Sequence, residues 1–397
     1  MSALGDIRVI ELGSFIAGPF ACQTLADLGA EVIKVEPPAG DPIRQWGRKT
    51  ENGESLWWPV IGRNKRSVCI DLKQPEGLDL LRGLIAEADV LCENFRPGVL
   101  ERMGLSPDTL WQRQPGLIIT RVSGYGQDGP YRERAGFASV AEAIAGMRYL
   151  NGYPDRPPPR SGLSIGDSIA GLFAALGTLS ALHERERTGR GQVVDVGLTD
   201  AILGVMESVI SEYSRIGHVR ERTGATLPGL APSNLYPTRD HGWIVIGANA
   251  DKPFRRLCQT MGRPELADDP RYATHAARGE HQEELDDIVR AWTLSHDQAD
   301  LDAALAAQGV PAGPLNNAAG VLADPHLRER GAVTEVDTGL GRLWMQNVVP
   351  RLSRSPGAIR WAGARLGAHT REVLQDMLAL DDGQMQALSE RGVVKWP

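Results

Sequence analysis

The sequence contains only four cysteines and eight histidines among its 397 residues, and neither type forms a cluster. The cysteines lie singly in apolar segments, so they predict neither a zinc site nor a disulfide framework and fit buried thiols in a reducing cytoplasm. The scattered histidines give little support to a metal centre or a Ser–His–Asp triad. We therefore expect no metal ligands in this chain.

Dense runs of lysine and arginine are also missing, and the net charge is −7. Nucleic acid is therefore not expected as a partner, although an acidic protein can still hold a local cationic pocket. The first residues lack a basic stretch followed by an apolar core, so no signal peptide is expected. The longest weakly polar run, 169–182, is short for a bilayer and predicts a buried helix. These features favour a cytoplasmic protein without a membrane partner.

An alternation of strand-like and helix-like segments fills roughly the first half of the chain. Strands are predicted at 7–12, 31–35, 67–70, 90–92, 117–122 and 192–196, and helices at 17–28, 75–86, 167–185 and 199–213. This repeated order favours an α/β fold with a doubly wound, Rossmann-like parallel sheet.

The character of the sequence changes near residue 215, where Pro228, Gly229, Pro232 and Pro237 mark a loop-rich passage. We divide the chain into the first part of a large domain (1–215), a smaller α+β domain with linkers (216–335) and a return to the large domain (336–397). Later elements are expected as strands at 243–246, 333–336 and 343–348 and helices near 251–261, 281–292, 297–308, 371–378 and 383–390.

The most informative segment is Gly162–Asp167, which places one carboxylate among glycines at the start of a small-residue helix. Asp is a preferred helix cap, which is the simplest interpretation of Asp167. Glycines also let a ligand approach the backbone closely, so the same carboxylate is a candidate for chemistry.

Two motif matches lack the context that their chemistry needs. The pattern around Ser164 fits the nucleophile elbow of serine hydrolases, but a proline-rich stretch at 157–159 precedes it instead of a strand. Gly124, Gly126 and Gly129 fit a dinucleotide fingerprint and follow a strand, but no apolar helix comes after them. A plain glycine loop is the better interpretation.

Read together, a series of short segments resembles the class III coenzyme A transferases, of the formyl-CoA:oxalate transferase type. The matching segments, in chain order, are Ala17–Pro19, Asp27–Glu36, Gly40-Asp41, Asn64–Ser67, Asp71–Lys73, Glu93–Gly98, Met103–Leu105, Gly166-Asp167, Thr188–Gln192 and Gly309–Pro314. Each segment is short, but their shared order over most of the chain is specific.

The resemblance implies a Rossmann-like large domain and a smaller second domain in a ring-shaped monomer. Two such monomers would thread through each other as an interlocked homodimer. It also implies that no cofactor is tightly bound, with coenzyme A and acyl-CoA acting as substrates.

By the same resemblance, Asp167 is the covalent catalyst, whose carboxylate attacks an acyl-CoA thioester and later carries CoA as an aspartyl thioester. CoA would lie along the residues that match the family's binding segments: Phe15, Ile16, Ala17, Ile70, Asp71, Leu72, Lys73, Asn94, Phe95, Arg96, Arg102, Ala135, Gly136, Phe137 and Ala138. Lys73, Arg96 and Arg102 are suitable partners for phosphate oxygens.

Three positions depart from the formyl-CoA transferase pattern. Ile16 stands where that enzyme has glutamine, Pro37 stands where it has arginine, and 229–234 lacks its run of four glycines. We therefore expect a different small carboxylic acid as acceptor, a dicarboxylate. The resemblance to the wider family, in which succinyl-CoA is the commonest donor, implies a donor such as succinyl-CoA.

Other functions stay open at this point. The α-methylacyl-CoA racemases share the fold, but Phe137 occupies the region of their catalytic histidine and cannot transfer a proton. A serine hydrolase using Ser164 and a CoA-binding protein without turnover are the remaining alternatives.

Overall fold

The computed structural model describes residues 2–50 and 53–397, which form two compact units. The first unit comprises Met1–Met147, Arg160–Ile216 and His326–Pro397, and the second comprises Arg148–Pro159 and Gly217–Pro325. The division inferred from the sequence differs in two places, because it puts 326–335 in the smaller domain and 148–159 in the larger one.

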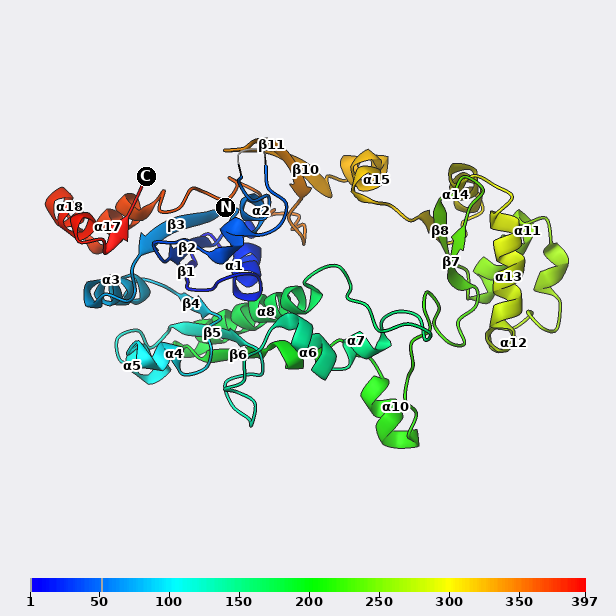
Figure 1. Cartoon of the computed structure of the whole chain (residues 1–397), viewed down its shortest axis with the longest axis horizontal. Coiled ribbons are helices and arrows are strands. Elements are labelled where there is room, and N and C mark those ends of the chain that lie inside the picture. The colour runs from blue at the N-terminus through cyan, green and yellow to red at the C-terminus, as the bar shows by residue number, and fades with distance from the viewer. Residues whose placement is uncertain (1, 51–52) are drawn as a thin grey trace. The chain divides into compact units, whose positions relative to one another are not determined.

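The first unit is built on a seven-stranded sheet with the order β12-β3-β2-β1-β4-β5-β6 (Figure 1). The strands are β1 (Arg8–Glu11), β2 (Glu31–Glu36), β3 (Lys65–Ile70), β4 (Val90–Glu93), β5 (Ile118–Ser123), β6 (Val193–Gly197) and β12 (Val394–Lys395). Strands β1 to β6 run parallel, and β12 pairs antiparallel with β3 at the edge. The expected parallel α/β sheet is thus confirmed.

Neighbouring residues of each central strand enter opposite cores, as the two-residue period of a strand dictates. Val9 and Val32 pack with α1 (Ala17–Asp27) and α8 (Ile165–Thr188) on one face. Ile10 and Ile33 pack on the other face with α3 (Pro75–Ala86), α17 (Thr370–Leu378) and α18 (Asp382–Glu390). Both faces are covered, which explains the continuous apolar runs of these strands.

The remaining helices of the first unit are short. They are η1 (Pro42–Gln45), α2 (Trp58–Ile61), α4 (Val99–Arg102), α5 (Pro107–Trp111), α6 (Ala138–Ile144), α9 (Leu198–Leu203), α10 (Val209–Ile216) and α16 (Pro325–Glu329, whose first residue closes the second unit). An antiparallel hairpin, β10 (Val333–Thr338) and β11 (Gly341–Gln346), matches the two strands expected there. The single helix expected at 199–213 is wrong, because α9 and α10 are separated by a turn that starts at Gly204.

Helix α8 differs from its prediction in length and in environment. It has 24 residues, and it is the one helix in the described ranges that is long and apolar enough to cross a membrane by length and composition. The expectation of a run too short for a bilayer is therefore corrected. Its small residues, such as Ala170, Gly171 and Ala174, are buried, and Gly171 lets the backbone of α1 come close. Leu172 and Leu176 instead remain 53% and 59% exposed.

The second unit contains a three-stranded antiparallel sheet of β7 (Ser233–Pro237), β8 (Trp243–Gly247) and β9 (Ala312–Pro314). Its helices are α7 (Met147–Leu150, which begins on the last residue of the first unit), α11 (Asp251–Thr260), η2 (Pro264–Ala267), α12 (His275–Glu280), α13 (Gln282–Thr293), α14 (Gln298–Ala307) and α15 (Ala318–Ala323). Tyr236, Ile244 and Leu301 belong to its core. The strand and the three polar helices expected here are confirmed, whereas β7 in the proline-rich passage was not anticipated.

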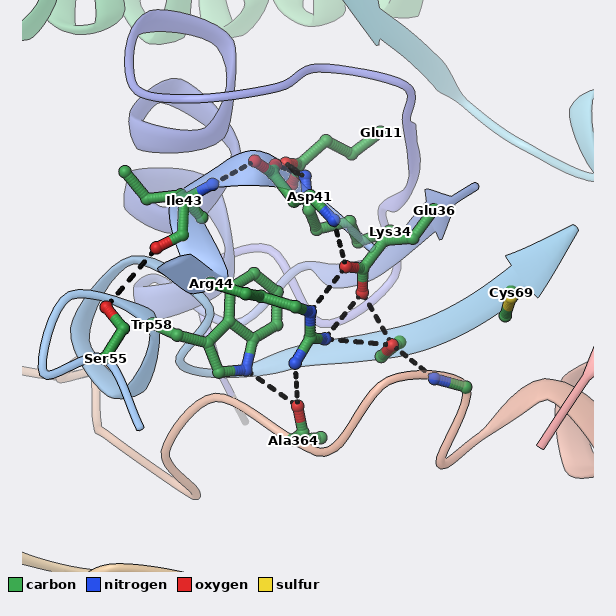
Figure 2. A network of polar contacts seen from close by, with 12 residues as sticks. Glu11, Lys34, Glu36, Asp41, Ile43, Arg44, Ser55, Trp58, Cys69 and Ala364 are labelled. Carbon is green, nitrogen blue, oxygen red and sulfur yellow. Dashed lines mark hydrogen bonds and ion pairs between the residues drawn. The ribbon is translucent and has the colours of Figure 1, made fainter. Parts of the chain in front are cut away.

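A buried ion network joins the carboxyl ends of β1 and β2 to the loop that follows β2 (Figure 2). Lys34 Nζ lies 2.8 Å from Glu11 Oε1 and 2.8 Å from Asp41 Oδ2, and all three side chains are almost fully buried. Burial by itself lowers the pKa of Lys34, but the charges of Glu11, Asp41 and Glu36 outweigh it and raise the pKa above its usual value. Lys34 is therefore charged at neutral pH.

Replacing Lys34 with methionine would remove the cation that contacts the buried Asp41, whereas Glu11 would keep Lys65 at 2.8 Å. We expect K34M to lower the free energy of unfolding by about 3–5 kcal/mol, as for other broken buried pairs. The matched control is R82M, since Arg82 forms an exposed pair with Asp79 and its loss should cost less than about 1 kcal/mol. Urea unfolding monitors both, and equal stabilities of the two variants would contradict this role of Lys34.

Candidate active site

A pocket of about 360 Å³ lies at the carboxyl ends of the central strands of the first unit. It is lined by the residues that follow β1 (Gly13, Ser14), β2 (Pro37), β3 (Asp71, Leu72, Lys73) and β4 (Phe95), among others. Strand order reverses between β1 and β4, and ligands of open α/β sheets bind at such a switch point. The pocket thus has the place and the size of a ligand site.

The loop after β1 forms one wall of this pocket and is held at three successive residues. Lys34 Nζ donates to the carbonyl of Gly13 at 2.7 Å. The Asn94 side chain accepts from the N–H of Ser14 and donates to its carbonyl, both at 2.8 Å. The N–H of Phe15 donates to Asp41 Oδ1 at 3.2 Å, and Phe15 has a φ of 62°, which is rare for a residue with a side chain.

The ion network behind this loop continues to β3 and to the last part of the chain (Figure 2). Arg44 binds both oxygens of Glu36 at 2.7 Å and donates to the carbonyl of Ala364 at 3.1 Å. Burial raises the pKa of Glu36, but the Arg44 guanidinium outweighs this effect and holds the pKa below its usual value. The network gives the pocket a rigid, charged base.

The cations expected to meet phosphate groups fall on two sides of the end of β4. Lys73 lines the first pocket together with Phe95. Arg96 and Arg102 line a second pocket of about 590 Å³, which also holds Arg132. A fourth arginine there, Arg121, is bound at 2.7 Å by both Glu93 and Glu101, so it is already neutralised. Arg132 lies 3.4 Å from Glu133 of the same pocket, which leaves Lys73, Arg96 and Arg102 as the cations among these that suit a polyanion.

The structure buries some of the expected contact residues. Ile16 packs against Ile43 and Trp58, and Ala17 is buried in another cluster at the start of α1, so their side chains face the interior. Asp71 is held within its own turn, since its Oδ1 accepts from the N–H of Lys73 at 3.1 Å. Of these three residues, Asp71 lines the pocket.

The segment 135–138 lies close in space to both the loop after β1 and the start of α8. The backbones of Gly136 and Gly124 are so close that a Cβ on either residue would lie within 3 Å of the other. The ring of Phe137 lies 6.3 Å from that of Phe15. Ala138 faces Gly166, where a Cβ would approach the Ala138 Cβ to 3.3 Å. Residues far apart in the sequence thus meet beside Asp167.

Asp167 lies in the first turn of α8, two residues after the helix begins, so it is not the N-cap. Ser164 occupies that position and makes no capping bond through its side chain. Burial, followed by the charge of Glu142, raises the pKa of Asp167 to about 6, against an opposing effect of Arg160. The carboxylate is therefore ionised at neutral pH but more basic than an ordinary aspartate, as a nucleophile requires.

Glu142 is a residue of this site that the sequence analysis missed. It is 3% exposed, and its Oε1 accepts a hydrogen bond of 3.4 Å from the N–H of Gly166. A signal for it was present, because Glu142 shares the buried stripe of α6 with Ala138, Ala141 and Ala145, spaced as one face of a helix. A carboxylate within an alanine stripe is a candidate for function. Its bond also occupies the Gly166 N–H, so that donor is not free to bind a substrate oxygen.

Neither the serine-hydrolase pattern at Ser164 nor the dinucleotide pattern at 124–129 has the flanking strand or helix that its chemistry requires. No strand leads into Ser164, which follows an irregular stretch after residue 150. The glycine loop after β5 is followed by turns up to Phe137, and α6 begins only at Ala138. Within the described ranges, no group of three or more His, Cys, Asp or Glu side chains is placed to hold a metal ion.

Comparison with known proteins connects this geometry to one family. The family model of CoA-transferase family III matches residues 4–370. Succinyl-CoA–D-citramalate CoA-transferase of Chloroflexus aurantiacus is 56% identical to this chain over 98% of each chain. The β subunit of succinyl-CoA–L-malate CoA-transferase of the same organism is 42% identical, again over 98% of each chain. A CaiB/BaiF family protein of Brucella suis has a similar crystal structure, with a TM-score of 0.84 and 36% identity over 95% of this chain and 99% of that one.

Because the pKa of Asp167 is raised in the folded protein, ionisation of this side chain lowers the free energy of unfolding. A folded-state pKa of about 6, above the ordinary 3.8, contributes stability at low pH that is lost as the pH rises through 6. We therefore expect D167N, which is neutral at all pH values, to melt at a higher temperature than the wild type at pH 7.5, with a smaller difference at pH 5. Thermal unfolding at both values checks this, and a difference independent of pH would contradict it.

Proposed function

The chain belongs to CoA-transferase family III and is a CoA-transferase, and from this premise we propose that it moves CoA from succinyl-CoA to a small dicarboxylic acid with Asp167 as covalent nucleophile. The observation that carries the proposal is the half-buried Asp167 carboxylate, raised in pKa, beside the segment 135–138, whose Phe137 ring lies 6.3 Å from that of Phe15 in the loop after β1. The names of the relatives support succinyl-CoA as donor.

The same names support a particular kind of acceptor. D-Citramalate and L-malate both carry a hydroxyl group next to one carboxylate of a butanedioate chain, to which citramalate adds a methyl group. We therefore propose a 2-hydroxydicarboxylic acid as the acceptor. This is more specific than the dicarboxylate expected from the sequence, and it agrees with the departures from the formyl-CoA transferase pattern at Ile16 and Pro37.

The first half of the reaction loads CoA onto the enzyme. An Asp167 oxygen attacks the thioester carbonyl of succinyl-CoA, the C–S bond breaks, and its electron pair leaves as the CoA thiolate. The thiolate then attacks the Asp167 acyl carbon of the resulting mixed anhydride and expels succinate. Asp167 now carries CoA as a thioester, and no proton has been transferred.

The second half reverses these steps with the acceptor. A carboxylate oxygen of the acceptor attacks the aspartyl thioester and again expels the thiolate, forming a new mixed anhydride. The thiolate attacks the acceptor carbonyl, releases the acyl-CoA product and restores the Asp167 carboxylate. A thioester is exchanged for a thioester, so the scheme needs no ATP and no tightly bound cofactor.

The residues around the pockets would bind and orient the substrate. The ammonium group of Lys73 and the planar guanidinium of Arg96 would bind phosphate oxygens. The loop held by Asn94 and Asp41 would fix the position of the thioester relative to α8. Phe137 offers no proton acceptor, so a racemase of this fold is not favoured.

We also propose that the enzyme works as a homodimer. Leu172 and Leu176 form an exposed apolar stripe on α8, and a second copy of the chain would cover it. The interlocked arrangement implied by the family stays a prediction. A cytoplasmic location is proposed because the four cysteines are free and buried.

Charging this stripe should hinder assembly of the subunits as they fold, since an interlocked pair could not come apart once formed. We expect L176E to lower the mass measured by light scattering from dimer toward monomer, because a carboxylate would be buried without a partner. The control is H183E, since His183 is an exposed residue farther along the same helix. A monomeric wild type, or a variant that stays dimeric, would contradict the assignment of this face.

Removing the nucleophile should abolish transfer while leaving substrate binding intact. We expect D167A to form product from succinyl-CoA and citramalate or malate at least about 10³-fold more slowly than the wild type, because the covalent route is closed. Mass spectrometry follows acyl-CoA products with citramalate, malate, glutarate and oxalate as acceptors. Retained turnover in D167A would refute the nucleophile, and preference for oxalate would refute the acceptor class.

A further inference from the structure

Glu142 is a buried carboxylate that the transfer scheme does not use. Its 3% exposure is low for a residue with a charge, and a buried carboxylate is normally held by a cation. Within the described part of the chain, no Lys, Arg or His forms an ion pair with it. Its hydrogen bond comes from the N–H of Gly166 in the first turn of α8, where the helix dipole favours negative charge.

The same turn carries Asp167, so two carboxylates share one helix start. The space around Gly166 is tightly filled, and a Cβ there would meet Ile202 at 3.0 Å and Glu142 Oε1 at 3.3 Å. Glu142 therefore has little freedom to turn away. The charged groups that face Asp167 are Glu142 from α6 and Arg160 from the segment before α8.

We propose that Glu142 is a positioning residue that favours the covalent intermediate by repelling the free Asp167 carboxylate. This inference rests on the proposed function. When CoA is loaded onto Asp167, the negative charge passes first to the CoA sulfur and then leaves with succinate, and the thioester side chain is neutral. The repulsion is present before the step and absent after it, so Glu142 shifts the equilibrium toward acylated enzyme.

Protonation of Asp167 removes the same charge as acylation does. Protonation and acylation of Asp167 both remove the repulsion from Glu142, so this repulsion contributes the same free energy to the two equilibria. Any substitution that removes only the charge of Glu142 must weaken proton binding and CoA loading by the same factor. A purely structural glutamate predicts no such correlation.

The variant E142Q tests this, because the glutamine oxygen can still accept the Gly166 N–H while the charge is lost. We expect the acid limb of kcat/KM for CoA transfer to move down by about one pH unit. The ratio of CoA-loaded to free enzyme, measured by intact mass at pH 7.5 with fixed succinyl-CoA and succinate, should fall by the same factor, about tenfold. The control is E186Q on the exposed far end of α8, which should change neither value.

The outcomes separate the two proposals. A wild-type enzyme that never carries CoA on Asp167 overturns the proposed function itself. A wild type that loads normally, with E142Q unchanged in either the pH profile or the loading ratio, overturns only the role of Glu142. Melting temperatures of both variants near that of the wild type ensure that folding is not the cause.

Discussion

The arrangement of the site depends on one buried ammonium group, that of Lys34. It bridges Glu11 and Asp41 and also holds the carbonyl of Gly13, so it ties the end of β1 to the end of β2 and to the loop that follows. Such a cation costs much to desolvate and is stable only with its partners in place. Because Asp41 in turn holds the N–H of Phe15, the shape of the switch-point pocket follows from this set of charges.

A second electrostatic constraint lies at the start of α8. The helix offers its N-terminal dipole to anions, and two carboxylates, Glu142 and Asp167, share it. Burial and mutual repulsion make the Asp167 charge costly in the free enzyme, with a pKa near 6. Under the proposed mechanism, covalent chemistry would relieve that cost, because the charge leaves Asp167. Stability would then be given up at the residue proposed to react, as functional sites often require.

Much of the fold could be predicted from the sequence. The strands are continuous apolar runs, and the apolar residues of α3 recur with the spacing of one helix face. The break between α9 and α10 and the two-residue strand β12 could not be predicted, since they depend on tertiary pairing. At the site, Asp167 was proposed from its glycine neighbours and from resemblance to the family, and it stays a prediction. Its position in the first turn and the burial of Ile16 were missed, because they follow from contacts between distant segments. Glu142 was missed although the alanine stripe around it is visible in the sequence.

The central claim is that Asp167 carries the CoA during turnover, and one measurement tests it directly. The wild-type enzyme is mixed with succinyl-CoA in the absence of acceptor, quenched, and examined by intact mass and peptide mapping. The account predicts a CoA thioester on the peptide that contains Asp167, lost on addition of citramalate together with formation of its CoA ester. Product formation without any adduct, or an adduct on another residue, would contradict it.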